Sequence, residues 1–332
     1  MEYVKLGSTG IDVSRICLGC MGFGHPDKWD LAPWVLNEEQ SMPILKSALA
    51  LGINFFDTAN IYSKGASEEV LGKAIKKYAK RDEVVIATKV FFQMHEGPNG
   101  QGLSRKAIFS EIDKSLIRLD MDYVDLYIIH RWDYSTPIEQ TMEALHDVVK
   151  AGKARHIGAS AMFGWQFQKA LHVAEKHGWT RFVSMQNHYN LMYREEEREM
   201  IPLCKEENIA LTPYSPLASG RLVRDWSITT KRTENDLVAV RKYGSTVELD
   251  RPVYERVAEL AEKKGVSKTQ IALSWLMHKT TIPIVGATKL SHVEEATASP
   301  VALTQKDMEH LEEPYVPHRV VGPIPIQQEL KV

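Results

Sequence analysis

Short apolar segments rich in β-branched residues alternate along the chain with longer segments whose apolar residues recur at helical spacing. This alternation is typical of strand–helix units built around a buried parallel sheet. The predicted strands are Ile16–Gly19, Ile53–Asp57, Val84–Lys89, Val124–His130, Ala154–Ser160, Phe182–Asn187, Ile209–Tyr214 and Ile282–Gly286. Eight strands of this kind predict an α/β fold of the (β/α)8 TIM-barrel class.

Sequence signals also mark several of the intervening helices. Thr136–Glu139 combines an N-cap threonine, a proline suited to the first helical position and a glutamate, and Ser267–Gln270 has the same kind of capping box. One helix is expected to cover the barrel wall with an apolar stripe formed by Ile108, Ile112, Leu116 and Leu119.

Two segments fall outside the eight units. Tyr3–Leu6 and Val13–Arg15 flank the turn-rich Gly7–Gly10, which predicts a hairpin ahead of the barrel that could close its floor. Arg221–Arg251, after the seventh strand, is polar and longer than a usual connection, so it is either functional or disordered, and we favour a functional loop. No linker divides the sequence, and we expect one domain over residues 1–332.

Composition narrows the classes of partner. The 332 residues are 44% hydrophobic and 25% charged, with 41 basic against 43 acidic side chains. Such a balance gives no strong field toward nucleic acid or anionic lipid, so a small neutral partner is expected. The chain starts without a signal-peptide pattern and has no apolar stretch near the ~20 residues that span a bilayer, which favours the cytoplasm.

The three cysteines allow two interpretations. Cys17 and Cys20 form a C-x-x-C motif typical of redox or metal sites, but Cys204 is remote and no second pair exists. Cysteine often packs as a small hydrophobe, so we expect reduced thiols in the core.

Polar residues end three neighbouring strands. Asp57, Lys89 and His130 close the second, third and fourth predicted strands, and Tyr62 follows Asp57 by five residues. Active sites of parallel barrels lie at the carboxyl ends of the strands, so these side chains are expected to meet. Each one alone has a structural alternative, such as a helix cap or a solvated rim residue.

Together the four side chains suit the reduction of a carbonyl. An ammonium beside a phenol is expected to lower the pKa of the phenol, while the carboxylate keeps the ammonium charged. Hydride addition to a carbonyl carbon leaves charge on the oxygen, which a positioned proton donor must meet. Tyr62 can donate that proton, and His130 can hydrogen-bond the same oxygen.

In their order and neighbours, Asp57, Tyr62, Lys89 and His130 resemble the catalytic tetrad of the aldo-keto reductases, in particular the bacterial NADPH-dependent barrel type. The resemblance spans almost the whole chain, because further similar motifs occur at Gly158–Ser160, Met185–Asn190, Tyr214–Gly220 and Pro283–Lys289. It implies an enzyme that reduces aldehydes or ketones to alcohols, with Tyr62 as the general acid.

The cofactor is expected at the barrel mouth. No G-x-G-x-x-G motif follows an early strand, so a Rossmann domain is not indicated. The resemblance implies NADPH, with its carboxamide held by Ser160 and Gln186 and its nicotinamide stacked on Tyr214. The other cofactor-binding residues that it implies are Gly19, Cys20, Met21, Asp57, Ser215, Leu217, Ala218, Gly220, Arg221, Arg232, Gly286, Thr288, Lys289, His292 and Glu295.

The last four residues of that set would bind the adenosine 2′-phosphate, which favours NADPH over NADH. Lys231 and Arg232 are expected to close over the pyrophosphate as a clasp. Ala161 and Ala296 stand where many family members carry polar residues, so carboxamide or ribose contacts and adenine contacts are expected to be weaker.

Aromatic and apolar residues just past the strand ends predict a pocket for a hydrophobic carbonyl compound. They are Met21, Phe23, Phe91, Phe92, Trp132 and Phe163. Two alternatives remain: an NADP-binding regulatory subunit with little turnover, and a metal-dependent barrel hydrolase suggested by twelve histidines. The histidines lack ligand spacing, so no metal is expected.

Overall fold

The computed structural model describes residues 1–29, 32–228, 236–279, 282–298 and 300–324. Eight parallel strands form one curved sheet in the order β10-β3-β4-β5-β6-β7-β8-β9. Their bounds are β3 Cys17–Gly19, β4 Phe55–Asp57, β5 Val85–Val90, β6 Val124–Ile129, β7 Ala154–Ser160, β8 Phe182–Gln186, β9 Ala210–Leu211 and β10 Ile284–Gly286. The backbone N–H of Ile284 donates to the carbonyl of Pro213 at 2.9 Å and joins the two edges of the sheet. The predicted (β/α)8 barrel is confirmed.

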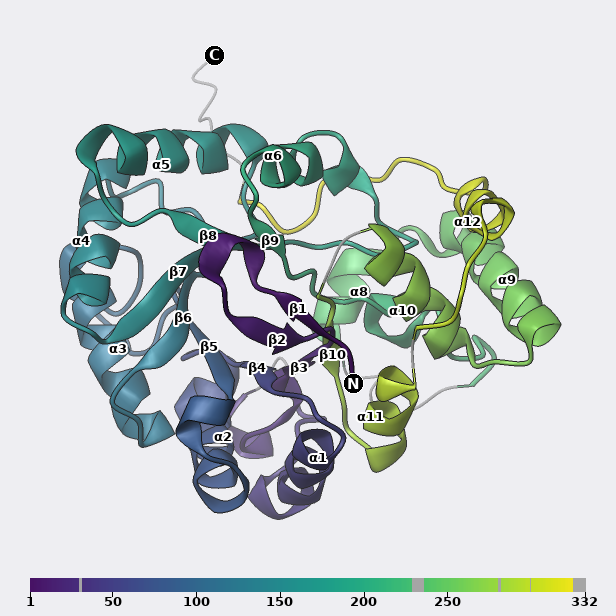
Figure 1. Cartoon of the computed structure of the whole chain (residues 1–332), viewed down its shortest axis with the longest axis horizontal. Helices are drawn as coiled ribbons and strands as arrows, with labels where there is room; N and C mark the ends of the chain where they lie inside the picture. Colours follow the sequence, from purple (N-terminus) through teal and green to yellow (C-terminus); the bar gives the residue numbers. More distant parts are fainter. Residues whose placement is uncertain (30–31, 229–235, 280–281, 299, 325–332) are drawn as a thin grey trace.

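Helices surround the sheet (Figure 1). They are α1 Glu38–Ala50, α2 Ala66–Tyr78, α3 Arg105–Leu119, α4 Ile138–Lys150, α5 Gly164–His177, α6 Met200–Glu206, α8 Leu237–Tyr243, α9 Val247–Lys264, α10 Lys268–Lys279, α11 Leu290–Thr297 and α12 Gln305–Glu312. The apolar stripe of α3 is confirmed, because Ile108, Ile112 and Leu119 are fully buried against the wall and Leu116 is half-buried.

One of the two predicted capping boxes forms. The backbone N–H of Gln270 donates to Ser267 Oγ at 3.2 Å, and that of Ser267 donates to Gln270 Oε1 at 3.0 Å. The prediction of a Thr136 cap is wrong: Pro137 is the N-cap of α4 and makes no side-chain cap. The Thr136 hydroxyl instead donates to the carboxylate of Asp133 at 2.8 Å, a charged and therefore stronger acceptor.

A hairpin closes the amino-terminal end of the barrel, as predicted. Strand β1 (Tyr3–Lys5) pairs antiparallel with β2 (Asp12–Ser14), and both lie across the barrel in Figure 1. Leu6 and Val13 are fully buried beside the inward-facing residues of the strands. Gly7, at φ +54°, lies so close to the sheet that an added Cβ would be 2.9 Å from the Val183 carbonyl oxygen.

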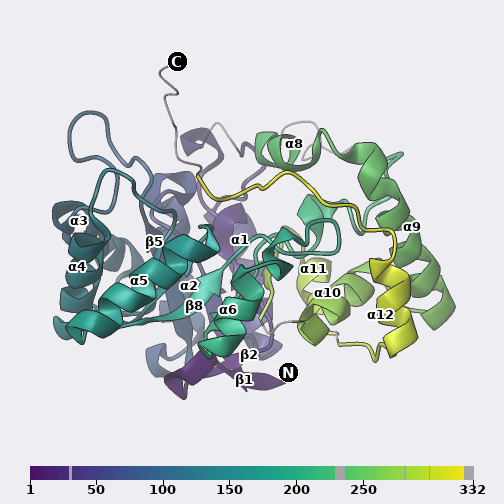
Figure 2. The same ribbon diagram turned by 90° about the horizontal axis from the view of Figure 1, so that it is seen from above.

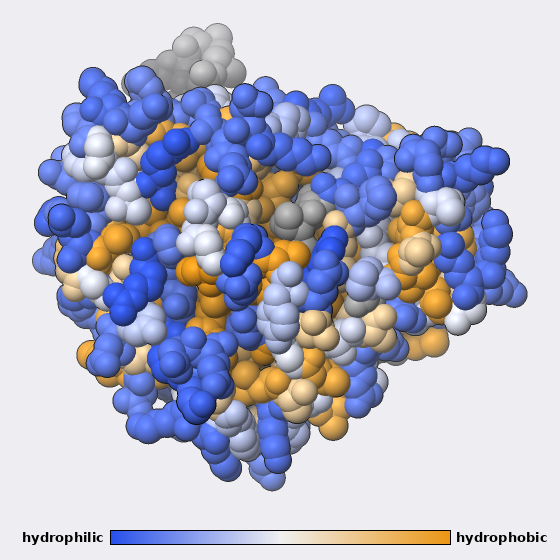
Figure 3. Space-filling model, in the orientation of Figure 1, coloured by the Kyte–Doolittle hydropathy of each residue, from blue (hydrophilic) through white to orange (hydrophobic). Residues whose placement is uncertain are grey.

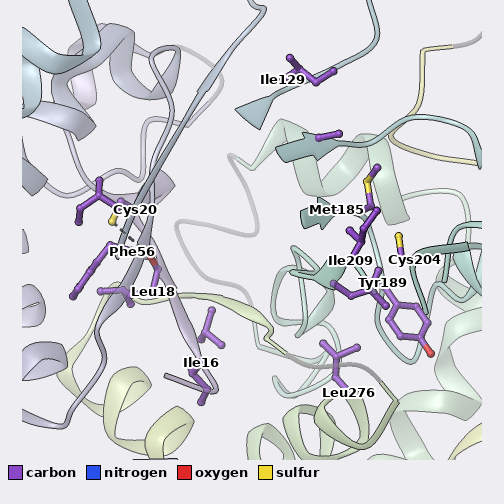
Figure 4. Close-up of a cluster of buried hydrophobic side chains, with 14 of the residues drawn as sticks. Ile16, Leu18, Cys20, Phe56, Ile129, Met185, Tyr189, Cys204, Ile209 and Leu276 are labelled. Atoms are coloured by element: carbon purple, nitrogen blue, oxygen red, sulfur yellow. Dashed lines mark hydrogen bonds between the residues drawn. The ribbon is translucent and has the colours of Figure 1, made fainter. Parts of the chain in front are cut away.

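A second, larger apolar core lies between the sheet and the helices, and Figure 4 shows part of it. Cys20 and Cys204 belong to this core and Cys17 to the inner one. All three thiols are unpaired and buried, and burial raises the pKa of each. They are therefore packing residues, as predicted.

The described parts of Arg221–Arg251 include α8 and the first turn of α9, so they are not irregular throughout. Lys231 and Arg232 lie outside the described residues, so the predicted clasp stays a prediction. Most of the surface in Figure 3 is hydrophilic. In the described part of the chain, no helix combines the length and the apolar character needed to cross a membrane.

Candidate functional site

The alternation of side chains along the strands positions the site. On β5, Val85 and Ala87 point into the barrel with the inner core, so Lys89 points the same way one layer higher. The same rule places Asp57 above Phe55 on β4. The polar residues therefore form the top layer of an otherwise apolar barrel, at the end opposite the hairpin.

Lys89 links the predicted catalytic residues. Its ammonium Nζ lies 2.5 Å from Asp57 Oδ1, 2.8 Å from the carbonyl oxygen of Thr58 and 3.2 Å from the hydroxyl of Tyr62. These three contacts use every N–H donor of the ammonium. The side chain is 0% exposed, so Lys89 is held rigidly between a carboxylate and a phenol.

Tyr62 follows β4 in a tightly bent loop. The next residues, Ser63, Lys64 and Gly65, have φ of 47°, 50° and 96°. Left-handed conformations at non-glycine residues cost roughly 1–3 kcal/mol each and persist where surrounding contacts fix them. Here the Asn60 amide donates to Glu111 Oε2 on α3 at 2.9 Å, which anchors the loop beneath Tyr62.

Lys89 lowers the pKa of Tyr62, as predicted, but the net direction of the shift is the opposite of the expected one. Burial raises the pKa of Tyr62 above its ordinary value of 10.0 and outweighs the lowering effect of Lys89. For Lys89, burial lowers the pKa, but the attraction of Asp57 and Tyr62 is larger and the net pKa is raised. At neutral pH the site therefore holds a protonated phenol beside an ammonium, the state that a proton donor needs.

His130 ends up neutral at the same rim. Burial, followed by the charges of Lys89 and Arg131, holds the pKa of His130 well below its usual range. Its ring lies edge-on to Tyr62, with 5.9 Å between ring centres, and edge-on to Phe92 at 4.8 Å. The structure thus brings all four residues of the predicted tetrad, Asp57, Tyr62, Lys89 and His130, to one place.

The residues expected to hold a carboxamide lie beside this group. Gln186, at the end of β8, donates through Nε2 to Asp57 Oδ2 at 2.8 Å, which leaves its carbonyl oxygen for a ligand. The buried Ser160 Oγ, Tyr214 hydroxyl and His130 Nδ1 find no hydrogen-bond partner among the described residues. Buried polar atoms are usually satisfied, so these orphan groups fit a bound polar ligand such as an amide.

The ring of Tyr214 is the expected stacking surface for the nicotinamide. His188 packs parallel to it, with 5.3 Å between ring centres, and the ammonium of Lys242 from α8 lies 4.4 Å from its centre. Lys242 also donates to the Ser215 hydroxyl at 3.3 Å. A flat ring stacked on the face that Lys242 covers requires this side chain to move.

The stretch expected at the pyrophosphate is sharply bent, with φ of 55° at Ser215, 48° at Ala218 and 91° at Gly220. The backbone N–H groups of Ala218, Gly220 and Arg221 donate to carbonyls within this bend, so few remain for an anion. The Arg221 guanidinium lies near Trp226 and Tyr243 and forms no ion pair in the described part of the chain. Its positive charge is therefore available to an anion at this bend. Leu217 is half-buried.

The residues expected at the adenosine end also come together. Strand β10 lies beside β3 with Gly286 opposite Gly19, so Thr288 and the exposed Lys289 follow at the same rim. His292 on α11 accepts from the backbone of Thr288 at 3.3 Å. On the next turn of α11, Glu295 lines a surface cleft of about 400 Å³ together with Val223, Ser267 and Lys268.

Two residues of the predicted substrate pocket border the tetrad, since Phe92 packs on the His130 ring and Phe91 packs on Phe92. Met21, Phe91, Phe92 and Phe163 are half-buried, and Trp132 is nearly buried. Phe23 is an exception, because its side chain is fully buried in the outer core and lines no open surface. The side chain of Cys20, which was expected in the cofactor-binding set, is fully buried in the same core.

Three aromatic residues near this pocket were not predicted. Trp29 stacks on Tyr62 with 5.7 Å between ring centres, and Trp165 packs beside Trp132 with 6.0 Å between ring centres. The hydroxyl of Tyr134 forms a hydrogen bond with the C-terminal segment. A tryptophan- and proline-rich stretch after the first strand was the available signal for Trp29.

The C-terminal segment, residues 315–324, also lies at the site and carried no sequence signal. It crosses the carboxyl end of the barrel near α8, with the hairpin at the opposite end (Figure 2). Val321 exchanges hydrogen bonds with the Tyr193 hydroxyl, and Tyr134 donates to the carbonyl of Ile324 at 2.7 Å. A Cβ on Gly322 would be 2.9 Å from the Tyr214 hydroxyl, so this segment borders the stacking surface.

The fold and the site define a (β/α)8-barrel protein with a lysine-linked tyrosine at the carboxyl ends of its strands. Comparison with known proteins makes this specific. The profile of the Aldo/keto reductase family matches residues 15–315. The chain belongs to this family of oxidoreductases.

Related proteins match along nearly their whole lengths. The chain is 45% identical to the versiconal hemiacetal acetate reductase of Aspergillus parasiticus, over 96% of this chain and 98% of the relative. It is 42% identical to an aldo-keto reductase of Metarhizium robertsii, over 97% of this chain and 93% of that relative. It is also 42% identical to a Schizosaccharomyces pombe protein named as an aryl-alcohol dehydrogenase, over 99% of this chain and 98% of that relative. These relatives come from fungi, whereas the sequence motifs had suggested a bacterial type.

Proposed function

We propose that this chain, as one barrel domain in the cytoplasm, reduces aldehydes or ketones to alcohols with NADPH and that Tyr62 is the general acid. The observation that carries the proposal is the hydrogen-bonded series from Asp57 through Lys89 to Tyr62, with His130 beside it. This series ends in an un-ionised, half-buried phenol at the rim of the barrel, which is where we expect the carbonyl oxygen of a substrate to bind.

Each residue of the tetrad has a defined task in this reaction. Tyr62 gives its proton to the substrate oxygen, and the neighbouring ammonium of Lys89 stabilises the phenolate that remains. Asp57 keeps Lys89 charged inside an apolar barrel. The neutral His130 hydrogen-bonds the same oxygen and orients the substrate.

Bound NADPH supplies the hydride. Its nicotinamide end would be held by Ser160, Gln186 and Tyr214. The Ser160 and Tyr214 hydroxyls are buried without a hydrogen-bond partner among the described residues, and the amide of Gln186 bonds Asp57 through its nitrogen alone. Arg221 would meet the pyrophosphate. Thr288, Lys289, His292 and Glu295 would bind the adenosine 2′-phosphate end, because a lysine and a hydroxyl lie there at the start of a helix.

The test follows NADPH absorbance with a panel of aldehydes, for wild type and Tyr62→Phe. General acids contribute roughly 100- to 10,000-fold, so kcat should fall by a factor in that range. NADPH binding, followed by protein fluorescence, should stay nearly constant because the phenol acts in the transition state. An unaltered kcat would refute the role of Tyr62, and tight NADPH binding without turnover in wild type would favour a regulatory protein.

Cofactor preference has a separate test. Lys289→Ala should lower kcat/KM for NADPH more than for NADH, because only NADPH carries the 2′-phosphate. Equal losses with both cofactors would overturn the assignment of Lys289.

A further inference from the structure

Arg131 is a cation at the substrate pocket that the proposed reaction does not use. It follows His130 directly, at the carboxyl end of β6, and its Nη1 donates to the His130 carbonyl at 2.5 Å. Its guanidinium lies 5.4 Å from the centre of the Phe92 ring, which itself packs on the His130 ring. The charge therefore borders the position where a carbonyl substrate would meet Tyr62.

No described residue neutralises this charge. Arg131 forms one hydrogen bond and one ring contact with the described part of the chain, and no ion pair. A guanidinium has five N–H donors in a planar fork that suits a carboxylate, and most of these donors are left over. By contrast, the buried cation Lys89 is fully paired in the same site.

Nearby charge strengthens the attraction for an anion. Burial and then the charge of Arg131 lower the pKa of Lys242 to about 7, so the two basic side chains are close enough to repel each other. An anion bound to Arg131 would offset this repulsion. Clefts that concentrate charge of one sign favour ligands of the opposite sign.

The shape of the surroundings defines the rest of the ligand. Trp29 lies against Tyr62, Phe92 against His130, and Trp132 against Trp165. Flat aromatic walls favour a flat apolar body, and an aryl group stacks well on such rings.

We propose that Arg131 selects aryl aldehydes or ketones that carry an anionic substituent, such as a carboxylate, by binding that substituent beside His130. This inference rests on the proposed reductase function and names its substrate class. A phosphate of the cofactor is the competing partner for Arg131. The contacts of Arg131 with the His130 carbonyl and the Phe92 ring favour the substrate, because both residues lie beside Tyr62, where the carbonyl is expected.

The experiment compares two substrates of nearly equal shape, 4-carboxybenzaldehyde and 4-formylbenzamide, in wild type, Arg131→Met and Arg155→Met. Arg155 is the matched control, since it also stacks on an aromatic ring, Tyr123, but near the start of β7 and far from the site. Charge-assisted hydrogen bonds predict a preference of roughly 10- to 100-fold in kcat/KM for the carboxylate. Arg131→Met should reduce this ratio to about one, while Arg155→Met keeps it.

Three results would overturn the inference: no preference in wild type, equal losses on both substrates in Arg131→Met, or weakened NADPH binding in that variant. The last would assign Arg131 to the cofactor. Calorimetry with benzoate and benzamide, with and without NADP, separates this inference from the reductase function. Selective benzoate binding that Arg131→Met abolishes supports the anion site even if no aldehyde is reduced, and equal weak binding of both probes refutes it.

Discussion

The pairing of Lys89 with Asp57 should contribute to stability as well as to chemistry. Both side chains are buried, with exposed fractions of 0% and 4%, and their charged atoms lie 2.5 Å apart. Replacing Lys89 by methionine leaves the carboxylate of Asp57 with only the Gln186 amide as a side-chain partner among the described residues. Removing one member of a buried ion pair costs about 3–5 kcal/mol, because the other charge stays buried and unpaired. Lys89→Met should lower the free energy of unfolding by that amount, and adding Asp57→Asn should recover much of it.

The chain offers a control with the same contact distance and little burial. Lys153 Nζ also lies 2.5 Å from a carboxylate, that of Asp113, but these side chains are 30% and 51% exposed. Exposed pairs are worth at most about 1 kcal/mol, so Lys153→Met should have a small effect. Urea unfolding followed by circular dichroism measures all variants at neutral pH. If Lys89→Met were no more destabilising than Lys153→Met, burial would not be what makes the Lys89 pair important.

Two further predictions concern the periphery of the barrel. The Asp250 carboxylate, 2.9 Å from the His318 imidazole, raises the pKa of His318 above its ordinary 6.5. The stabilisation by this pair is complete below pH 6.5 and disappears as the pH rises through the raised pKa of His318. His318→Asn should therefore lower the melting temperature more at about pH 5.5 than at about pH 9. Equal decreases at the two pH values would contradict the pairing. In Gly72→Ala, the new Cβ would be 2.2 Å from the Leu119 carbonyl oxygen, and overpacking should cost about 1–3 kcal/mol in urea unfolding. Gly286→Ala is its control, because a Cβ there meets nothing within 4 Å.

The strands could be predicted because a strand buried on both faces is a continuous apolar segment. All eight occur, but several are shorter than the segments that predict them. The seventh was expected over Ile209–Tyr214 and extends only over Ala210–Leu211. Pro213 lacks the N–H that would continue the ladder, although Tyr214 still forms an isolated bridge with His188.

The chemistry of the strand ends was also accessible, because the carboxyl ends of parallel strands share one rim. Contacts between distant parts of the chain were not. The bond from Gln186 to Asp57 joins residues 129 positions apart, and the C-terminal segment reaches Tyr134 across 190 positions. The direction of the Tyr62 pKa depends on how deeply the fold buries the phenol, which local sequence does not encode.

The alternation of side chains couples the stability of this barrel to its chemistry. The period that sends Val85 and Ala87 inward on β5 also sends Lys89 inward, where an unpaired ammonium would be strongly unfavourable. The groups that make this position tolerable are a carboxylate from the neighbouring strand and a phenol from the loop after it. Carbonyl reduction needs an acid positioned by a charged lysine. The same arrangement therefore stabilises the buried ammonium and supplies the proton donor. Substitutions at these strand ends should therefore impair folding and turnover together, whereas a change at Arg131, which contacts neither Lys89 nor Asp57, should alter the choice of substrate more than the stability of the fold.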